Sequence, residues 1–284
     1  MILVTGATGN NGAEITRRLA GSGLRVRAMV RKHPHATDAL PHVQYVTADF
    51  DDPESIRPAL EGVHRAFLTT NSTERVEGQQ LNFVKQALAA GVRHIVYLSQ
   101  LHATRNSPVR FLRYHAVVED AIRSSGIAFT HLRPNLFMQG LLGFRSSIAA
   151  EGRFFAPAGD VSVSIVDVRD IAAIAAAALT QDEHAGKTYD ITGPEALTHA
   201  QMASVFTSVL AKPVSYVDVP EAAMRDSLLH FGFPEWQADG LIEDYAHYRR
   251  GEAMEVSTAV ADVTGQPPRS FRQFVQDYRQ AFLQ

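Results

Sequence analysis

Three evenly spaced glycines behind an apolar run constrain the fold of this chain more than any other feature. The sequence begins MILVTGATGNNG, in which Gly6, Gly9 and Gly12 stand three residues apart. Glycine allows a turn with positive φ, a close approach of the backbone to a pyrophosphate, and tight packing of a helix on a strand. A helix that begins here also offers free N–H groups and a partial positive charge to an anion. The stretch predicts a strand, a nucleotide-binding loop and a helix; an ordinary glycine-rich turn is the alternative.

Strand and helix patterns alternate from the first residue to residue 133. Apolar segments predict strands at 2–4, 24–30, 43–48, 64–70, 94–99 and 127–133. Helical patterns fall between them at 11–20, 76–90 and 109–125. A further helix begins near Asp52 and Pro53, residue types suited to the N-cap and the first helical position. Such alternation implies right-handed crossovers and a parallel sheet. We therefore predict an α/β fold with a Rossmann-type doubly wound sheet, whose ligand lies at the carboxyl ends of the strands.

Beyond residue 133 the pattern becomes mostly helical. A short strand and a helix are expected within 161–180, and another strand at 187–192. Further helices are expected at 198–211, 221–231, 235–249 and 270–283. We predict an NAD(P)-binding Rossmann-type domain at 1–133 and a smaller, mostly helical substrate-binding lobe at 134–284. The lobe is interleaved with the first domain as one unit, with a cleft between them.

Composition and charge exclude several classes of protein. The chain has 284 residues, a formal net charge of −3 and no cysteine, which excludes disulfides, thiolate metal sites and cysteine nucleophiles. Basic residues form no long block, so nucleic-acid binding is not expected, and no run of about 18 apolar residues predicts a membrane span. His33 and His35 have the wrong spacing for a metal site, so no metal is expected. We expect a cytoplasmic protein; its oligomeric state stays open, with a homodimer as one option.

The residue at the end of the second predicted strand selects the nucleotide. An NAD site usually has an acidic residue about 20 residues beyond the loop, which accepts a hydrogen bond from the ribose 2′-OH. Here the segment AMVRKH has Arg31 and Lys32 at that place. A guanidinium can pair with a 2′-phosphate. The sequence therefore favours NADP(H) over NAD(H); a solvated basic end of a strand is the alternative.

Polar residues also follow the third and fourth predicted strands. In ADFDDP, Asp49 offers a carboxylate for the adenine amino group and Phe50 a ring beside the base. In LTTN, Thr69, Thr70 and Asn71 would border the ribose and phosphates of the cofactor, or form an ordinary polar turn.

Motifs along almost the whole chain resemble the NmrA-like family of atypical short-chain dehydrogenase/reductases. They are TGATGNNG, ADFDDPESI, HIVYLS, LRPNLF, VDVRDIA and VTGQPPRSFRQFVQDY. Within the family, the resemblance is closest to the bacterial branch of NADPH-quinone oxidoreductases and triphenylmethane reductase. It implies a Rossmann-type domain with bound NADP(H) and a cleft beside the nicotinamide. The loop residues that would contact the cofactor are Gly6, Thr8, Gly9, Asn10, Asn11 and Gly12.

The sequence departs from short-chain dehydrogenases at the catalytic pair. They normally use Tyr-x-x-x-Lys, but here Val118 stands four residues after Tyr114. His115 stands four residues before Glu119, where many family members have a lysine, and the resemblance directs it toward the nicotinamide ribose or the substrate. Glu119, one helical turn on, could orient His115, and the imidazole could donate a proton near neutral pH. A structural histidine is the alternative, and Tyr114 is disfavoured as the donor because adjacent helical residues point in different directions.

Two further segments complete the predicted site. Ser99 ends the fifth predicted strand, where it would polarise the substrate or merely cap the strand. After the sixth strand, the resemblance places Pro134, Asn135, Leu136 and Phe137 beside the nicotinamide. Asn135 could bond to cofactor or substrate, and Phe137 could pack on a flat acceptor or belong to the core. We thus expect His115, Ser99 and Asn135 at the catalytic centre.

Two functions remain. The first is an NADPH-dependent reductase that transfers hydride to a flat conjugated acceptor such as a quinone, because such acceptors need little acid catalysis. The second is a non-catalytic regulator that senses NADP(H) and acts through a protein partner. Nucleotide-sugar epimerisation is disfavoured, since it needs the missing tyrosine and lysine.

Overall fold

The computed structural model describes residues 1–33 and 39–284 and divides into two compact units. Unit 1 contains residues 1–106, 112–133 and 171–189, and unit 2 contains residues 107–111, 134–170 and 190–284. One boundary falls after residue 133, where the sequence places the division between its two parts. Residues 171–189 nevertheless belong to unit 1, although the sequence assigned them to the second part, because they add a helix and a strand to the sheet.

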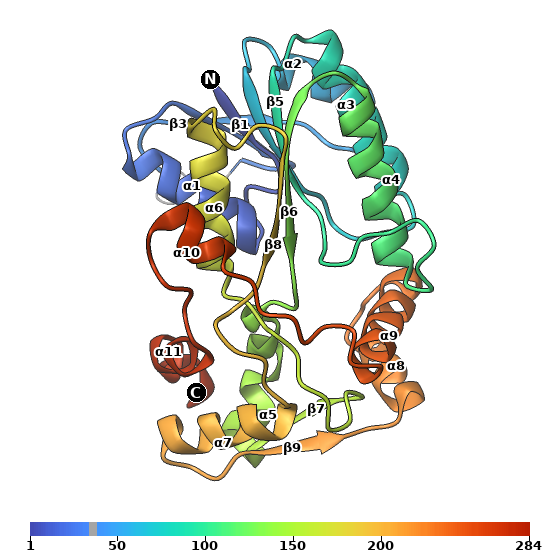
Figure 1. The fold of residues 1–284 in the computed structure, drawn as a ribbon, viewed down its shortest axis with the longest axis vertical. Helices are drawn as coiled ribbons and strands as arrows, with labels where there is room; N and C mark the ends of the chain where they lie inside the picture. The colour runs from blue at the N-terminus through green and yellow to red at the C-terminus, as the bar shows by residue number, and fades with distance from the viewer. Residues whose placement is uncertain (34–38) are drawn as a thin grey trace. The chain divides into compact units, whose positions relative to one another are not determined.

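Unit 1 is built on a seven-stranded sheet with the order β3-β2-β1-β4-β5-β6-β8 (Figure 1). The strands are β1 (Ile2–Val4), β2 (Val26–Val30), β3 (Val43–Thr47), β4 (Arg65–Leu68), β5 (His94–Leu98), β6 (Ala128–Pro134) and β8 (Lys187–Ile191). β1 pairs in parallel with β2 on one side and with β4 on the other, and the pairs β2–β3, β4–β5 and β5–β6 are parallel as well. The chain order reverses at β1, the place where open α/β sheets bind ligands. The predicted Rossmann-type fold and its strands are confirmed.

Helices cover both faces of this sheet. They are α1 (Asn10–Gly21), α2 (Pro53–Ala59), α3 (Val76–Ala89), α4 (Arg110–Ser124) and α6 (Val168–Thr180). α1 and α6 lie on one side of the strands, and α3 and α4 on the other (Figure 1). The central strands β1, β4 and β5 are largely buried on both faces, so they read as continuous apolar runs rather than as alternating patterns; all five residues of β5 are buried. This packing holds the carboxyl ends of the strands in one row.

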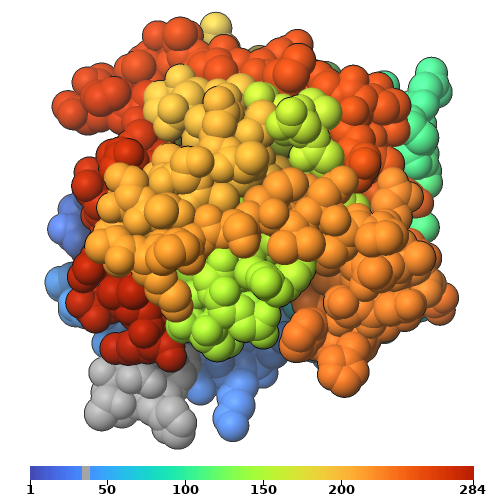
Figure 2. Space-filling view, turned by 90° about the horizontal axis from the view of Figure 1, so that it is seen from below, coloured from blue at the N-terminus to red at the C-terminus, as the bar shows by residue number. Residues whose placement is uncertain are grey.

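Unit 2 contains a two-stranded parallel sheet of β7 (Arg153–Ala156) and β9 (Ser215–Asp218). Its helices are η2 (Met138–Phe144), α5 (Arg145–Glu151), α7 (His199–Leu210), α8 (Glu221–His230), α9 (Glu235–Arg249), α10 (Ala259–Thr264), α11 (Phe271–Asp277) and η3 (Arg279–Phe282). Figure 2 shows α5 and β7 in yellow-green beside α7, β9 and α8 in orange, in agreement with the contacts among these elements. Phenylalanines from α7, α11 and η3 form the centre of the core, where the rings of Phe206 and Phe282 lie 4.9 Å apart.

Two expectations for this half of the chain are corrected, and one small sheet was not predicted. The short strand expected after residue 160 is absent from the described residues, where Val163 and Val166 form isolated bridges only. The helix expected at 270–283 is broken at Tyr278, which leaves helical geometry with φ −100° and ψ 13°. β7 and β9 were not predicted, because four-residue strands paired across some 60 residues carry no local pattern.

None of the helices in the described part of the chain is both long and apolar enough to cross a membrane.

Candidate functional site

The glycine loop after β1 needs two of its three glycines for the protein's own geometry. Gly6 has φ +59°, and a Cβ there would lie 2.6 Å from Cγ2 of Thr69. A Cβ on Gly12 would lie 2.2 Å from the carbonyl oxygen of Gly6, because α1 begins against the loop. Gly9 differs: it has an extended conformation, and its nearest neighbour would be Gly6 O at 3.4 Å. The lack of a side chain at Gly9 therefore leaves room beside the loop for a ligand.

The N-terminus of α1 has the features of an anion-binding site. Its N-cap, Gly9, has no side chain to cap the helix, and the first turn contains no acidic residue. The first N–H groups of a helix have no partner within the helix, so here they are left for a bound group. Asn11 is buried, and its Oδ1 has no hydrogen-bond partner in the described chain. Together with the exposed Thr8 and Asn10, these residues fit the pyrophosphate of a dinucleotide.

A basic residue follows the next strand of the sheet. β2 ends at Val30, and Arg31 comes directly after it as an exposed side chain without an ion pair among the described residues. Lys32 and His33 are exposed too, whereas His35 lies outside the described residues. Because β2 lies beside β1 in parallel, Arg31 stands at the sheet edge that holds the glycine loop. Arg31 thus has the position that the predicted 2′-phosphate role requires, and its guanidinium forms no ion pair within residues 1–33 and 39–284; the role itself stays a prediction.

The segment after β3 lies at the same edge. Asp49 is half-buried, and its Oδ1 accepts a hydrogen bond of 3.0 Å from the N–H of Asp51. The ring of Phe50 packs 5.8 Å from that of Phe83 on α3, so one of its faces belongs to the core. Asp52 occupies the N-cap of α2 as predicted, but its side chain makes no capping hydrogen bond.

Thr69 and Thr70 come at the end of β4, and the backbone there is tied to β1. The hydroxyl of Thr5 donates to Thr69 O at 2.8 Å and accepts from Thr69 N at 2.9 Å. Asn71 follows as an exposed residue. The parallel sheet therefore brings to one edge the loop after β1, Arg31, Asp49 and Thr69, which lie far apart in the sequence.

His115 on α4 is held by a buried row of hydrogen bonds. Its Nδ1 lies 2.7 Å from the hydroxyl of Tyr97 on β5. That hydroxyl donates to Oε1 of Gln80 on α3 at 2.8 Å, and Nε2 of Gln80 donates to Thr70 Oγ1 at 2.9 Å. Burial lowers the pKa of His115 to about 3 and raises that of Tyr97 well above its usual value. The imidazole is therefore neutral at physiological pH, which argues against the proton-donor role predicted from the sequence.

Glu119 does not orient His115; its hydrogen bonds go elsewhere. Ser99 donates to Oε1 of Glu119 at 2.6 Å, and Arg133 donates to both carboxylate oxygens at 2.8 and 2.6 Å. Burial would raise the pKa of Glu119, but Arg133, then the nearby His131 and Ser99, outweigh it and hold the pKa far below its usual value. The hydroxyl hydrogen of Ser99 is thereby used within the protein.

The ring of Tyr114 packs against the ring of its neighbour His115. Its ring centroid lies 4.1 Å from that of His115, at an angle of 34° between the planes. The expectation that these neighbours point apart is wrong, because both rings lie in the buried layer under α4. The hydroxyl of Tyr114 lies 3.4 Å from Ser72 Oγ.

Residues 135–137, which follow β6, belong to unit 2. Asn135 donates both amide hydrogens, to Ser164 Oγ at 2.8 Å and to Ala253 O at 2.9 Å. Its Oδ1 accepts from Leu136 N, so the side chain has little capacity left for a ligand. Phe137 is half-buried, and Leu136 packs on the core of the unit. The role of Pro134, Asn135, Leu136 and Phe137 beside the nicotinamide stays a prediction.

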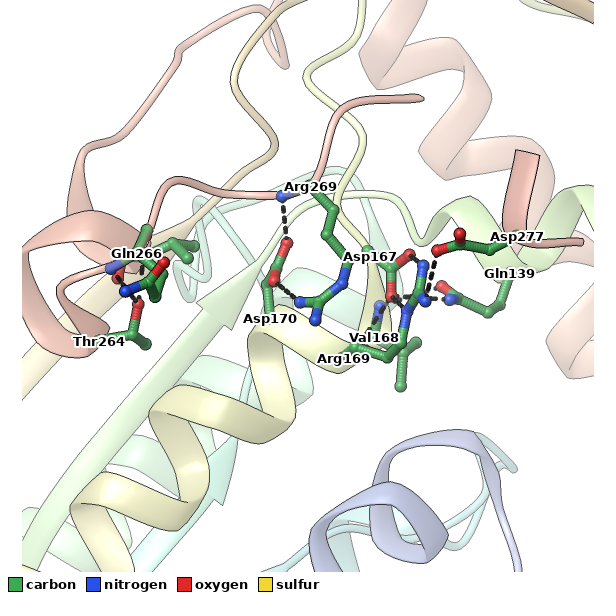
Figure 3. Close-up of polar contacts among 10 residues, drawn as sticks. Gln139, Asp167, Val168, Arg169, Asp170, Thr264, Gln266, Arg269 and Asp277 are labelled. Atoms are coloured by element: carbon green, nitrogen blue, oxygen red, sulfur yellow. Dashed lines mark hydrogen bonds and ion pairs between the residues drawn. The ribbon is translucent and has the colours of Figure 1, made fainter. Parts of the chain in front are cut away.

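The VDVRD motif forms an ion-pair network at the start of α6 (Figure 3). Arg169 pairs with Asp167 at 2.7 Å and with Asp277 at 2.6 Å, and Asp170 pairs with Arg269. The network ties the C-terminal segment to α6, and we assign it a structural role. Among the described residues, no three or more His, Cys, Asp or Glu side chains are grouped so that they could hold a metal ion.

Sequence reasoning missed three residues of the site: Gln80, Tyr97 and Arg133. Arg133 carries no clear signal, because its strand also contains Thr130 and His131. Gln80 and Tyr97, in contrast, are polar residues within an apolar helix face and an apolar strand. That misfit was the available signal, because a buried polar group must find a partner.

Known proteins resemble this chain in sequence and in structure. The profile of the NmrA-like family matches residues 1–267. NAD(P)H azoreductase from Xenophilus azovorans is 34% identical over 283 residues, which cover 99% of each chain. Quinone oxidoreductase 2 from Escherichia coli is 31% identical over 281 residues, which cover 97% of each chain. The crystal structure of the NADPH-dependent quinone oxidoreductase from Escherichia coli, complexed with NADPH, superposes with a TM-score of 0.87 and 29% identity, covering 98% of this chain and 100% of that one.

Proposed function

Because the chain belongs to the NmrA-like family, we propose that it is an NADPH-dependent reductase acting on a flat conjugated acceptor such as a quinone. The observation that carries the proposal is the likeness, over 98% of the chain, to a quinone oxidoreductase crystallised with NADPH. The uncapped helix N-terminus behind the glycine loop supports it, as does Arg31 at the end of β2, which has no ion pair in the described part of the chain.

The residues that would hold the cofactor lie along the carboxyl edge of the sheet. The pyrophosphate rests on Gly6, Thr8, Gly9, Asn10, Asn11 and Gly12, and Arg31 pairs with the 2′-phosphate. Asp49 and Phe50 meet the adenine, and Thr69, Thr70 and Asn71 border the ribose and phosphates. When bound, NADPH supplies the hydride that reduces the acceptor.

The protein supplies orientation rather than acid catalysis. The pair Tyr-x-x-x-Lys is missing, since Val118 stands four residues after Tyr114. Ser99 donates its hydroxyl hydrogen to Glu119, and His115 is neutral. A quinone tolerates this because its reduced anion is stable, so holding the acceptor in a shielded site is sufficient. We further propose a cytoplasmic location, which fractionation of cells would test, and a homodimer, which light scattering on the purified protein would test.

A turnover assay tests the proposal. Purified protein is mixed with NADPH and a panel of quinones, and the loss of nicotinamide absorbance is followed. We expect acceptor-dependent oxidation, and we expect Arg31→Glu to weaken NADPH binding by more than tenfold while affecting NADH far less, since only NADPH carries the 2′-phosphate. Arg18→Glu, at an exposed position on α1, is the matched control and leaves both affinities unchanged.

Two results would count against this assignment. Binding of NADPH with no oxidation by any quinone would favour the alternative, a regulator that senses NADP(H) and acts through a protein partner. Equal binding of NADH and NADPH by the unmodified protein would contradict the role of Arg31.

A further inference from the structure

The row of hydrogen bonds behind His115 links four elements of unit 1. It runs from Thr70 after β4 to Gln80 on α3, then to Tyr97 on β5 and His115 on α4. Gln80 is 1% exposed, Tyr97 0% and His115 8%, so water does not compete for the inner groups. Of these three residues His115 retains the most accessible surface, and it stands at one end of the row.

The orientation of the Gln80 amide fixes the directions of the other hydrogen bonds in the row. The amide of Gln80 is oriented with Nε2 toward Thr70, so its Oε1 faces Tyr97 and can only accept. A phenol has one hydrogen, and that of Tyr97 is given to Gln80. The 2.7 Å contact between Tyr97 and His115 then requires the hydrogen to lie on Nδ1 of the imidazole. In a neutral ring this leaves Nε2 as a bare acceptor.

The charged and titratable groups around the ring do not reverse this order. Tyr97 faces it from β5 and Tyr114 from its own helix, while Glu119 and Arg133 act from farther away with opposite charges. Burial dominates and keeps the pKa of His115 near 3, so the ring stays neutral. Among the described residues, no hydrogen bond reaches Nε2 of His115.

We propose that Gln80 and Tyr97 are positioning residues that hold His115 in the Nδ1–H tautomer, so that Nε2 meets the ligand as a hydrogen-bond acceptor. A group that bonds to Nε2 must then bring an O–H or an N–H. A quinone carbonyl brings neither, whereas the ribose hydroxyls and the carboxamide of a nicotinamide nucleotide bring both. His115 therefore holds the cofactor and does not contact the oxygen of the acceptor. This assignment of the ligand rests on the proposed function.

The tautomer can be measured in the full-length protein without any cofactor. Protein labelled with 15N-histidine is studied at neutral pH by long-range 1H–15N correlation, in which protonated and bare ring nitrogens have clearly different shifts. The His115→Gln spectrum identifies the signals of His115 among those of the other histidines. We expect a protonated Nδ1 and a bare Nε2.

Variants of Gln80 separate this role from a merely structural one. In Gln80→Leu the hydroxyl of Tyr97 loses its acceptor and turns to Nδ1, so the hydrogen of His115 moves to Nε2 although Gln80 does not touch the ring. Gln80→Glu retains an accepting oxygen and keeps the original tautomer. Gln86→Leu on the same helix, which loses a hydrogen bond to Pro53 O, is the matched control and changes nothing at His115. If Gln80→Leu does not fold, Tyr97→Phe removes only the hydroxyl and is expected to shift the ring toward Nε2–H.

The functional readout follows from the same variants. We expect Gln80→Leu and Tyr97→Phe, the second of which keeps the hydrogen bond from Gln80 to Thr70, each to raise the Kd for NADPH about fivefold to tenfold, the effect of one lost hydrogen bond at His115, with kcat for quinones within about a factor of two. A bare Nδ1 in the unmodified protein, or an unchanged tautomer in Gln80→Leu, would overturn the inference. A collapse of kcat with an unchanged Kd would overturn the assignment of His115 to the cofactor. Failure of the unmodified protein to bind NADPH would instead refute the proposed function, and the tautomer would still be decided by the spectra.

Discussion

Replacing Gly12 with alanine places a methyl group inside the glycine loop. The new Cβ would lie 2.2 Å from Gly6 O and 2.9 Å from Ala7 N, where ordinary contact begins at 3.4 Å. The obstructing atoms are backbone, so no side chain can swing away, and the loop must open by roughly an ångström. Overpacking of this kind costs about 1–3 kcal/mol of folding stability. Because the same shift moves the first N–H groups of α1, NADPH should bind at least about tenfold more weakly, which is ~1.4 kcal/mol.

Thermal unfolding followed by circular dichroism and a fluorescence titration with NADPH measure the two effects. The matched control is Gly21→Ala at the other end of the same helix, where a Cβ would meet nothing within 4 Å and φ is not positive. Alanine there should leave NADPH binding unchanged and stabilise the helix by up to about 1 kcal/mol. The reasoning on the loop is refuted if Gly12→Ala unfolds at the wild-type temperature and binds NADPH with wild-type affinity.

Three further substitutions test the buried polar groups. Glu119→Gln removes the charge that Arg133 and Ser99 contact and should lower the free energy of unfolding by about 2–3 kcal/mol at neutral pH. Because the pKa of Glu119 is depressed, the difference in stability between the variant and the wild type should shrink as acid protonates the carboxylate. Burial lowers the pKa of His94 to about 4, so the unfolded chain binds the extra proton and stability should fall between pH 6.5 and 4; His94→Gln should flatten this fall. Asn135→Asp turns a donor to Ser164 and Ala253 into an acceptor and should destabilise the protein by about 2–3 kcal/mol.

Melting temperatures measured across pH check all three. A Glu119→Gln variant as stable as wild type at pH 7 would contradict the ion-pair argument. His64→Gln is the control for His94, since His64 is exposed; an equal change in both variants would show that burial is not the cause. Weaker NADPH binding by Asn135→Asp at unchanged stability would show that Asn135 contacts the cofactor after all.

Much of the nucleotide-binding half was predictable because its signals are local. Each strand carries a run of apolar residues, and Gly6 and Gly12 report a turn and a close contact within a few residues of themselves. The position of Arg31 follows from the length of a single strand. The small sheet of β7 and β9 was missed for the opposite reason, since each strand is only four residues long and its partner is distant.

The hydrogen-bond partner of His115 could not be predicted from the spacing of residues in the sequence. Glu119, one helical turn away, was the natural candidate from the sequence, yet the ring bonds to Tyr97 on β5. Which side chains meet across elements depends on the register of strands and on how far each helix is rotated against the sheet. Neither quantity is written in the order of residues along one helix.

The sequence by itself determined the α/β fold, the glycine loop and the position of the basic residue Arg31 after β2, because these depend on backbone geometry and on neighbouring residues. Only the tertiary structure decided that Ser99 and Arg133 bond to Glu119 and that Gln80 and Tyr97 control the imidazole. The physical reason is burial. Once packing excludes water, each polar group must bond to whichever partner the fold brings within reach.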